Sequence, residues 1–423
     1  MAPNRLMALI AGTSGAKLYS MGLNIIALAL TARWLGPDGR GALATLTTWV
    51  NTVALLASLS LGTVAMQRLA GCRHSERFGA VLHALFLWAL GLTLFAWFVV
   101  ALLRWGGGSA LFGEVPDWAL ALVFVMLPCL LWEGYANALL TTIERLRVFN
   151  LSLITGRTLM LLGLLGLAWF DQVTLASVLL VSIVGQCWIA FYSAPTLKAF
   201  AAEHGGVRFM PSESTALLHG GVRLHLNTVG TLALNMAGTL MIASMVGVRE
   251  AGFFQLAQQL MSVLLVIPQS ASLVLYGRQG ELGPDQVWPL QRKMVFLIVL
   301  LTAGIGAVLA LTAPYWLVLV AGAGYEPAVP LLLSLLPALV VLSFSSIMAS
   351  QWIGRGFFLS ASMITLVVGA GNLLAASILI PRFGVMGAIY GQMLALSVSI
   401  LTNGAMAVWC ERRFRQQAIR PLG

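Results

Sequence analysis

The chain has 423 residues, of which 59% are hydrophobic and 9% are charged, and its formal net charge is +10. Soluble domains carry about 25% charged residues, and a compact soluble chain needs polar residues to cover its surface. The composition therefore excludes a soluble domain and indicates a protein whose main solvent is lipid.

Twelve segments of the chain are apolar and long enough to cross a membrane, since a helix needs ~20 apolar residues to span about 30 Å of hydrocarbon. In chain order they are 8–32, 42–66, 79–103, 117–141, 148–170, 174–196, 216–246, 252–276, 294–313, 328–351, 357–380 and 385–409. The first segment is interrupted by Thr13, Ser14 and Lys17, which argues against a cleaved signal peptide. We therefore predict an all-α integral membrane protein of about twelve transmembrane helices.

The distribution of Lys and Arg between the loops predicts the orientation of these helices. If the N-terminus is cytoplasmic, 16 of these residues lie in inside loops and 5 in outside loops. Cytoplasmic loops carry the excess of Lys and Arg, so the bias predicts that both termini are cytoplasmic. It also explains the positive net charge without a nucleic-acid partner. We expect a multi-pass membrane protein.

The two halves of the sequence resemble each other. A shift of 211 residues overlays Gly36 on Gly247 and Leu23-Asn24 on Leu234-Asn235. Each repeat holds six predicted helices, and an even number gives both repeats the same direction in the membrane, as in parallel repeats. We predict an N-terminal six-helix lobe at 1–197, a polar cytoplasmic linker at 198–215, a C-terminal six-helix lobe at 216–410 and a basic tail at 411–423.

Polar residues form stripes on the first two predicted helices of each half. A helix that faces lipid on all sides has no use for Asn or Gln, because a polar group without a partner costs a few kcal/mol there. Hydrogen bonds between helices are the alternative explanation. We favour a water-filled cavity between the halves, and its predicted lining residues are Asn24, Asn51, Asn227, Asn235, Gln255 and Gln259.

Four charged residues lie inside predicted helices: Lys17, Glu133, Arg157 and Arg223. Ionisable residues within membrane helices are functional candidates by default. A Glu133–Arg157 ion pair between neighbouring helices is the structural alternative, and proton coupling through Glu133 is the functional one. Three cations against one acid favour an anionic cargo such as a diphosphate, because Arg and Lys bind phosphate oxygens.

Three motifs in order resemble the polysaccharide (oligosaccharide) flippase family. They are Arg33-Trp-Leu-Gly-Pro-Asp-Gly-Arg-Gly41, Gly322-Ala-Gly-Tyr-Glu-Pro-Ala-Val-Pro-Leu331, and Asn372-Leu-Leu continuing to Ile380-Pro-Arg-Phe-Gly-Val-Met-Gly-Ala388. This family belongs to the superfamily that also contains multidrug exporters and lipid II flippases.

The resemblance implies two six-helix lobes in a V shape with alternating access between them. It implies an undecaprenyl-diphosphate-linked oligosaccharide as cargo, moved to the periplasmic leaflet for O-antigen, capsule or exopolysaccharide synthesis. The family's cationic cavity residues correspond to Lys17 and Arg223, and we add Arg157 as a further candidate for the diphosphate. Membrane lipids and the polymerase of the same glycan pathway are the other expected partners.

Other classes of function fit the sequence less well. A multidrug or cation antiporter would bind organic cations, which the internal cations repel, and a lipid II-type flippase has two helices more. A polymerase or ligase needs a large outside loop with reactive groups, and the outside loops here are short, so we predict no enzyme activity. No nucleotide-binding loop occurs, and the cysteines lack metal or redox spacing, so no cofactor or metal is expected.

Overall fold

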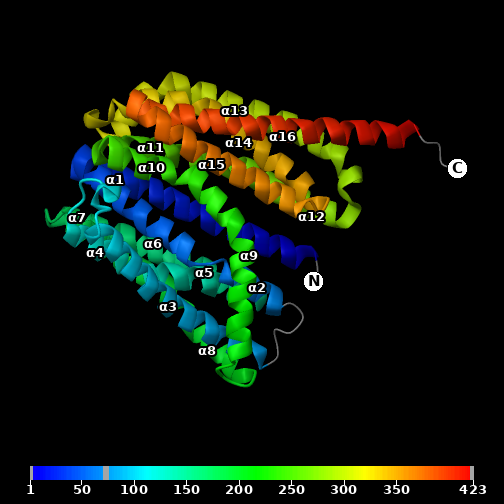
Figure 1. The fold of residues 1–423 in the computed structure, drawn as a ribbon, viewed down its shortest axis with the longest axis horizontal. Helices are drawn as coiled ribbons and strands as arrows, with labels where there is room; N and C mark the ends of the chain where they lie inside the picture. Colours follow the sequence, from blue (N-terminus) through cyan, green and yellow to red (C-terminus); the bar gives the residue numbers. More distant parts are fainter. Residues whose placement is uncertain (1–2, 70–75, 420–423) are drawn as a thin grey trace. The chain divides into compact units, whose positions relative to one another are not determined.

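The computed structural model describes residues 3–69 and 76–419. The side chains of a further set within this range are outside the description: 3–14, 17, 18, 223, 224, 226, 227, 273, 277, 280, 281, 320, 358 and 417–419. The described chain consists of helices and the turns between them, which confirms the predicted all-α class (Figure 1). It forms two compact units, Met1–Thr228 and Val229–Gly423, and the boundary between them lies within one helix.

The first unit is a bundle of helices from the N-terminal half. It contains α1 (Pro3–Ala57), α2 (Leu61–Leu69), α3 (Arg77–Trp105), η1 (Ser109–Phe112), α4 (Asp117–Phe124), α5 (Leu127–Thr142), α6 (Leu146–Trp169), α7 (Leu175–Tyr192), α8 (Ala194–Glu203) and most of α9 (Pro211–Asn235). α1 packs against α6, α6 against α7, and α2 against α5.

The second unit repeats this kind of bundle. It contains the end of α9 followed by α10 (Ala237–Met245), α11 (Val248–Leu264), α12 (Val266–Leu282), α13 (Pro284–Ala321), η2 (Ala323–Tyr325), α14 (Ala328–Gly354), α15 (Phe358–Phe383) and α16 (Val385–Ile419). α14 packs against α11, α12, α13 and α16 and so lies at the centre of this unit. The segment after residue 410, predicted as a tail, continues α16 as a helix to Ile419.

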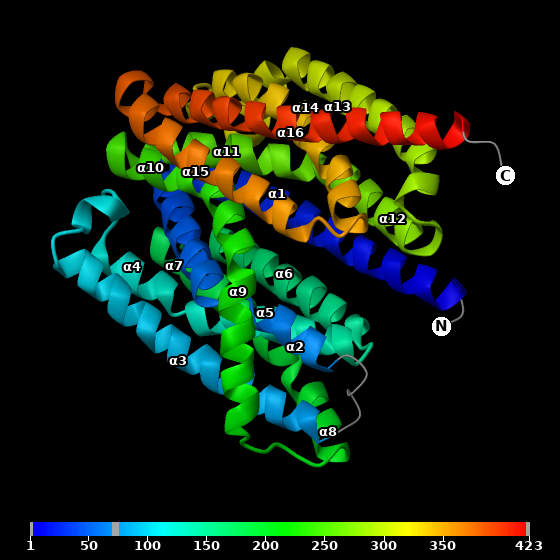
Figure 2. The ribbon, with the colours of Figure 1, turned by 45° about the vertical axis from the view of Figure 1, so that its right-hand side comes forward.

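The number of candidate membrane spans is close to the twelve that the sequence predicts. By length and composition, the described residues hold nine helices able to cross a membrane, or up to eleven if each of two bent pairs counts as one span. One bent pair contains α1, whose backbone leaves the helical conformation at Gly36 (φ 66°, ψ −178°). The chain reverses direction there (Figure 2), so the predicted helices 8–32 and 42–66 are the two arms of this feature.

The repeat is visible in the backbone. Gly36 and its repeat partner Gly247 both adopt positive φ, at 66° and 154°, in a region that residues with a Cβ rarely enter. The fourth span of each half, α4–α5 in one and α14 in the other, is the most enclosed. Buried residues make up 61% and 50% of the most apolar stretch of these two spans, against 17–39% in the other seven candidate spans.

The outer helices display apolar side chains that lipid would cover. On α3, Phe95, Phe98 and Leu102 are 64%, 65% and 59% exposed. Burying such side chains in an apolar medium is favourable, at about 1.5–3 kcal/mol for a large residue that passes from exposed to buried. The surface of the bundle is therefore suited to hydrocarbon.

Within the first unit, ion pairs hold the start of α9 to α2 and α3. The Glu213 carboxylate accepts hydrogen bonds from Arg68 (2.8 Å) and Arg77 (2.7 Å), which flank the loop between α2 and α3. Partial burial alone would raise the pKa of Glu213, but the two guanidinium groups outweigh it and lower the pKa below its usual value. The carboxylate is therefore ionised at neutral pH, and the predicted linker is tied to this unit.

Glycines allow α6 and α7 to pack closely. A Cβ added at Gly156 would clash with the Ile189 side chain, and one added at Gly185 would lie 3.2 Å from the carbonyl oxygen of Gly156. Small residues commonly let helix backbones approach in membranes, where association relies on van der Waals contact.

Replacement of Gly156 is expected to loosen this contact. Gly156→Val should lower the free energy of unfolding by about 1–3 kcal/mol, the usual cost of overpacking, measured as a fall in melting temperature of the purified protein in detergent. Gly166→Val on the same helix is the matched control, because nothing lies within 4 Å of a Cβ there. Equal melting temperatures for the two variants would contradict the close α6–α7 contact.

Candidate functional site

Two of the predicted phosphate-binding cations lie on neighbouring helices of the first unit. α1 carries Lys17 and packs along α6, which carries Arg157. The Tyr19 hydroxyl and the Thr158 hydroxyl are 3.0 Å apart. This bond brings the α1 turn that contains Lys17 beside the α6 turn that contains Arg157, whose side chain is half-buried. The side chains of Lys17, Arg223 and Asn227 are outside the described part of the structure.

Amide side chains are exposed on helices that are otherwise apolar. Asn24 and Asn51 in the first unit are exposed, and so are Asn235 and Gln259 in the second, while Gln255 is half-buried. The amide nitrogens of Asn51 and Asn235 donate to carbonyls of their own helices, at 2.7 and 3.0 Å. Exposing an amide to hydrocarbon is costly. These positions therefore suit faces that meet water or a polar ligand.

Glu133 is bonded within the first unit, but not to the residue suggested by the ion-pair alternative. Its carboxylate accepts a short hydrogen bond from the side-chain amide of Gln186, so the bond joins α5 to α7. One turn earlier on α5, the sulfur of Cys129 lies 3.3 Å from that of Cys187. Within the described residues no ion pair joins Glu133 to Arg157. Both side chains are half-buried.

Asn372 of the third sequence motif supports a break in the helix that follows the linker. α9 ends at Asn235 and α10 starts at Ala237, with a bend of 47°. The buried Asn372 amide on α15 donates to the carbonyls of Ala233 (3.1 Å) and Leu234 (3.4 Å). Backbone acceptors in the last turn of a helix lose intrahelical partners. The Asn372 amide replaces them.

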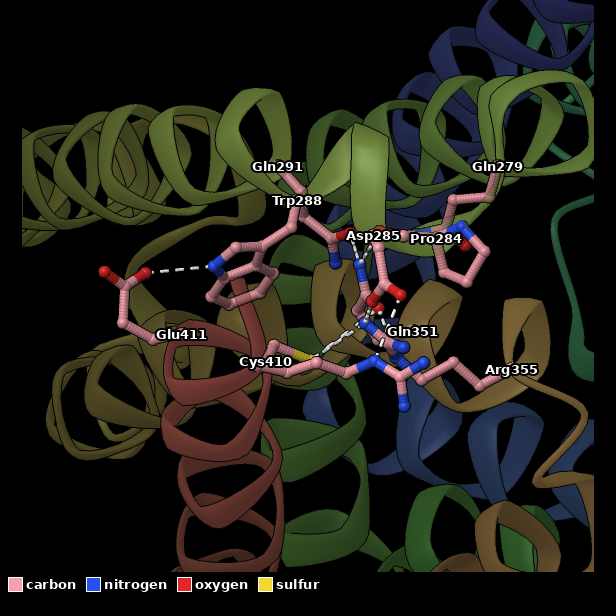
Figure 3. Close-up of polar contacts among 10 residues, drawn as sticks. Gln279, Pro284, Asp285, Trp288, Gln291, Gln351, Arg355, Cys410 and Glu411 are labelled. Atoms are coloured by element: carbon pink, nitrogen blue, oxygen red, sulfur yellow. Dashed lines mark hydrogen bonds and ion pairs between the residues drawn. The ribbon is translucent and has the colours of Figure 1, made fainter. Parts of the chain in front are cut away.

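A polar cluster joins four helices at one end of the second unit (Figure 3). The buried Gln291 on α13 accepts hydrogen bonds from Gln279 on α12 (2.9 Å) and Gln351 on α14 (2.6 Å). Asp285 accepts ion pairs from Arg355 (2.7 Å) and from Arg413 on α16 (3.0 Å). The Arg355 side chain is 6% exposed. A buried charge is tolerated when it is paired and hydrogen-bonded, as here.

Sequence reasoning missed this cluster and the role of Asn372. In the sequence, Arg355 counted only toward the charge of the loops, and Gln279, Gln291 and Gln351 received no role. The hydrogen-bond partners of these glutamines lie 12 to 71 residues away along the chain. The spacing of residues within one helix therefore cannot predict these contacts. For Asn372 a signal existed, because a buried amide in an apolar helix requires partners.

The first and second motifs shape turns between helices. Gly36 of the first motif adopts the positive φ that divides α1. In the second motif Gly322, with φ of 102°, ends α13, and the buried Tyr325 ring packs edge-on against Phe253 at 5.6 Å. These motif residues position helices rather than supply ligand groups.

A sequence profile decides the family. The profile of the polysaccharide biosynthesis protein family matches residues 8–276, which is more than half of the chain. The chain belongs to this family. No curated protein matches the sequence as a recognisable relative.

Several solved transporter structures share the fold of this chain. An inward-facing multidrug resistance MATE family transporter of the MOP superfamily is 16% identical, with TM-score 0.73, and the alignment covers 94% of this chain and 96% of that one. The lipid II flippase MurJ in an inward closed conformation is 12% identical, with TM-score 0.75, and coverage is 92% and 86%. A MOP superfamily transporter from Pyrococcus furiosus with a binding pocket of reverse polarity is 14% identical, with TM-score 0.63 and coverage of 95% and 96%.

At these identities the likeness establishes the fold. Together with the family, it confirms the resemblance that the three sequence motifs predicted, and it shows that the chain has the two-lobe fold of these membrane transporters.

Loss of the Asn372 amide is expected to weaken the helix break. Asn372→Leu keeps the volume but leaves the carbonyls of Ala233 and Leu234 without this donor, at a cost of about 1–3 kcal/mol. Thermal unfolding of the purified protein measures the loss. Ser377→Ala, an exposed position on α15 whose hydroxyl bonds its own helix, is the control. If both variants melt with the wild type, Asn372 does not support the break.

Proposed function

We propose that this protein is a flippase that moves an undecaprenyl-diphosphate-linked oligosaccharide from the cytoplasmic to the periplasmic leaflet by alternating access. The protein would act in the bacterial inner membrane with both termini in the cytoplasm, and would serve the synthesis of O-antigen, capsule or exopolysaccharide. The family supports the pathway. The observation that carries the cargo class is the pairing of the Lys17 turn of α1 with the Arg157 turn of α6 inside membrane helices.

The physical need for such a protein lies in the cargo. Burying an isolated ion in hydrocarbon costs tens of kcal/mol on a Born estimate. Cations within the transporter reduce this cost by replacing the hydration of the phosphates. In the proposal Lys17, Arg157 and Arg223 bind the diphosphate. The sugar hydroxyls contact the amides of Asn24, Asn51, Asn227, Asn235, Gln255 and Gln259, of which those described are exposed or half-buried.

The membrane potential is a sufficient source of energy for this direction. Each elementary charge that crosses the membrane gains ~2.3 kcal/mol per 100 mV. Two negative charges moving outward across an inside-negative potential therefore gain about 4–5 kcal/mol per 100 mV. The proposal needs no nucleotide hydrolysis within this chain.

Two other kinds of transporter have the same fold. The MATE transporters and the lipid II flippase MurJ match this chain with similar TM-scores, 0.73 and 0.75, so the fold does not discriminate between them. The internal charges argue against an organic cation as cargo. The first two predicted helices of each half contain no internal Asp or Glu that would attract one.

Complementation tests the cargo and the cationic site together. In a bacterium that lacks its own oligosaccharide flippase, the wild type is expected to restore surface glycan, while Lys17→Ala, Arg157→Ala and Arg223→Ala each reduce it at least tenfold at matched expression. Arg145→Ala is the control, since Arg145 is an exposed residue in the turn before α6.

The outcomes separate the hypotheses. Full activity of all three alanine variants would leave the transporter assignment intact but remove the diphosphate site. Failure of the wild type in hosts with several different glycans, together with resistance to organic cations, would favour the antiporter.

Proton coupling through Glu133 is a separate part of the proposal. Glu133→Gln cannot exchange a proton, yet an amide at this position can still hydrogen-bond Gln186, so the helix contact is kept. We expect the variant to lose the pH dependence of transport while it expresses normally. Glycan export measured from pH 5.5 to 8 decides this, and an unchanged pH profile would rule out coupling through Glu133.

A further inference from the structure

A basic groove lies on the second unit between α13 and α16, with α14 beneath it. Its volume is about 620 Å³. Arg292 on α13 and Arg412 and Arg415 on α16 line its polar part, and Phe344 and Met348 on α14 line its apolar part. None of these residues has a role in the proposed transport of the glycan.

The groove carries a net positive charge. Glu411 is the acid among the lining residues, and it accepts hydrogen bonds at 3.0 Å from the Trp288 indole, from Arg292 and from Arg415. Three arginines less one glutamate leave two positive charges. Arg412 is exposed and has no ion pair or hydrogen bond among the described residues. Arg292 and Arg415 remain 51% and 74% exposed, so a ligand can reach them.

The position of the groove is that of a membrane interface. One to two turns further along α13, Phe296, Leu297 and Leu300 are 71%, 63% and 58% exposed, as expected for side chains that face lipid. At ~1.5 Å per residue, Arg292 lies about 6 Å beyond Phe296 along the helix axis. The guanidinium groups therefore stand at the edge of the apolar surface, and the Trp288 indole lies where tryptophan is enriched in membrane proteins.

The polar cluster joins the helix ends beside the groove. Asp285 forms ion pairs with Arg355 (Figure 3) and with Arg413, and Arg355 also lies over the Trp409 ring at 4.7 Å. These contacts join the ends of α13, α14 and α16. The arginines of the groove are consequently presented from a preformed surface.

We propose that this groove binds the headgroup of an anionic phospholipid, with the phosphate on Arg292, Arg412 and Arg415 and an acyl chain along Val295 and Phe344. Basic pockets between membrane helices at the cytoplasmic side bind such headgroups. Two net positive charges disfavour a zwitterionic lipid with its own cationic group, and the apolar lining offers nothing to a soluble anion. The proposal is independent of which glycan the protein carries.

Native mass spectrometry of the full-length protein tests the proposal. The delipidated protein in detergent is titrated with dioleoyl-phosphatidylglycerol and, separately, with dioleoyl-phosphatidylcholine. We expect preferential binding of phosphatidylglycerol. Arg412→Gln should weaken it about fivefold, which corresponds to the ~1 kcal/mol contributed by one basic side chain at an anionic surface. Arg292→Gln/Arg412→Gln/Arg415→Gln should abolish the preference.

Two further variants separate the site from general effects of charge and folding. Glu411→Gln removes the competing carboxylate and should tighten the binding of phosphatidylglycerol, which a misfolded variant could not do. Arg145→Gln/Arg147→Gln/Lys198→Gln removes three exposed charges from the first unit and should leave binding unchanged.

Other results would overturn the proposal. They are equal retention of the two lipids by the wild type, an equal loss of binding in the first-unit triple variant, and displacement of phosphatidylglycerol by millimolar inorganic phosphate. The last result would assign the groove to a soluble anion.

Discussion

Hydrocarbon cannot form hydrogen bonds, and this constraint decides where the polar side chains of the protein lie. Hydroxyl groups within the spans bond the carbonyl one turn earlier, as Thr31 does to Ala27 (2.8 Å) and Thr93 to Ala89 (2.7 Å). Amides that bond across helices, such as Gln258 to Gln392 (2.8 Å), fix one helix against another. Where the chain exposes amides on an apolar helix instead, the constraint implies that water or a ligand meets them. The candidate site is recognised on this ground.

The same constraint divides the charged residues into two groups. Those at the helix ends form dense networks, as Glu213 does with Arg68 and Arg77, and Asp285 with Arg355 and Arg413. Those within the helices are few, and the ones described are only half-buried. End networks stabilise each unit as a body, whereas the internal Glu133 is bonded to the Gln186 amide rather than to a cation. The proposed transport of a charged cargo would need both groups, because the networks hold each unit together and the internal cations would bind the cargo.

Much of the fold could be predicted from the sequence, since apolar length and helical period are local properties. The twelve segments, the repeat and the family motifs all required only spacing along the chain. The interpretation was incomplete wherever a side chain has a distant partner. Glu133 bonds Gln186, 53 residues away, and Gln279 bonds Ser350, 71 residues away. Asn372, quoted only as part of a motif, supports a helix break 138 to 139 residues earlier. These pairings cannot be predicted from a single sequence. The side chains of Lys17 and Arg223 are outside the described part of the structure.

The paired turns at Gly36 and Gly247 have a consequence for the history of the chain. Each sits at positive φ, where any other residue is strained regardless of the space around it. Apolar positions that face lipid can exchange Leu, Ala, Val or Met at little cost, so two halves of common origin can diverge at those positions. The two glycines are exempt from this drift. Both halves therefore keep a glycine at the same turn, and the two halves can be aligned at this turn even where their apolar residues differ.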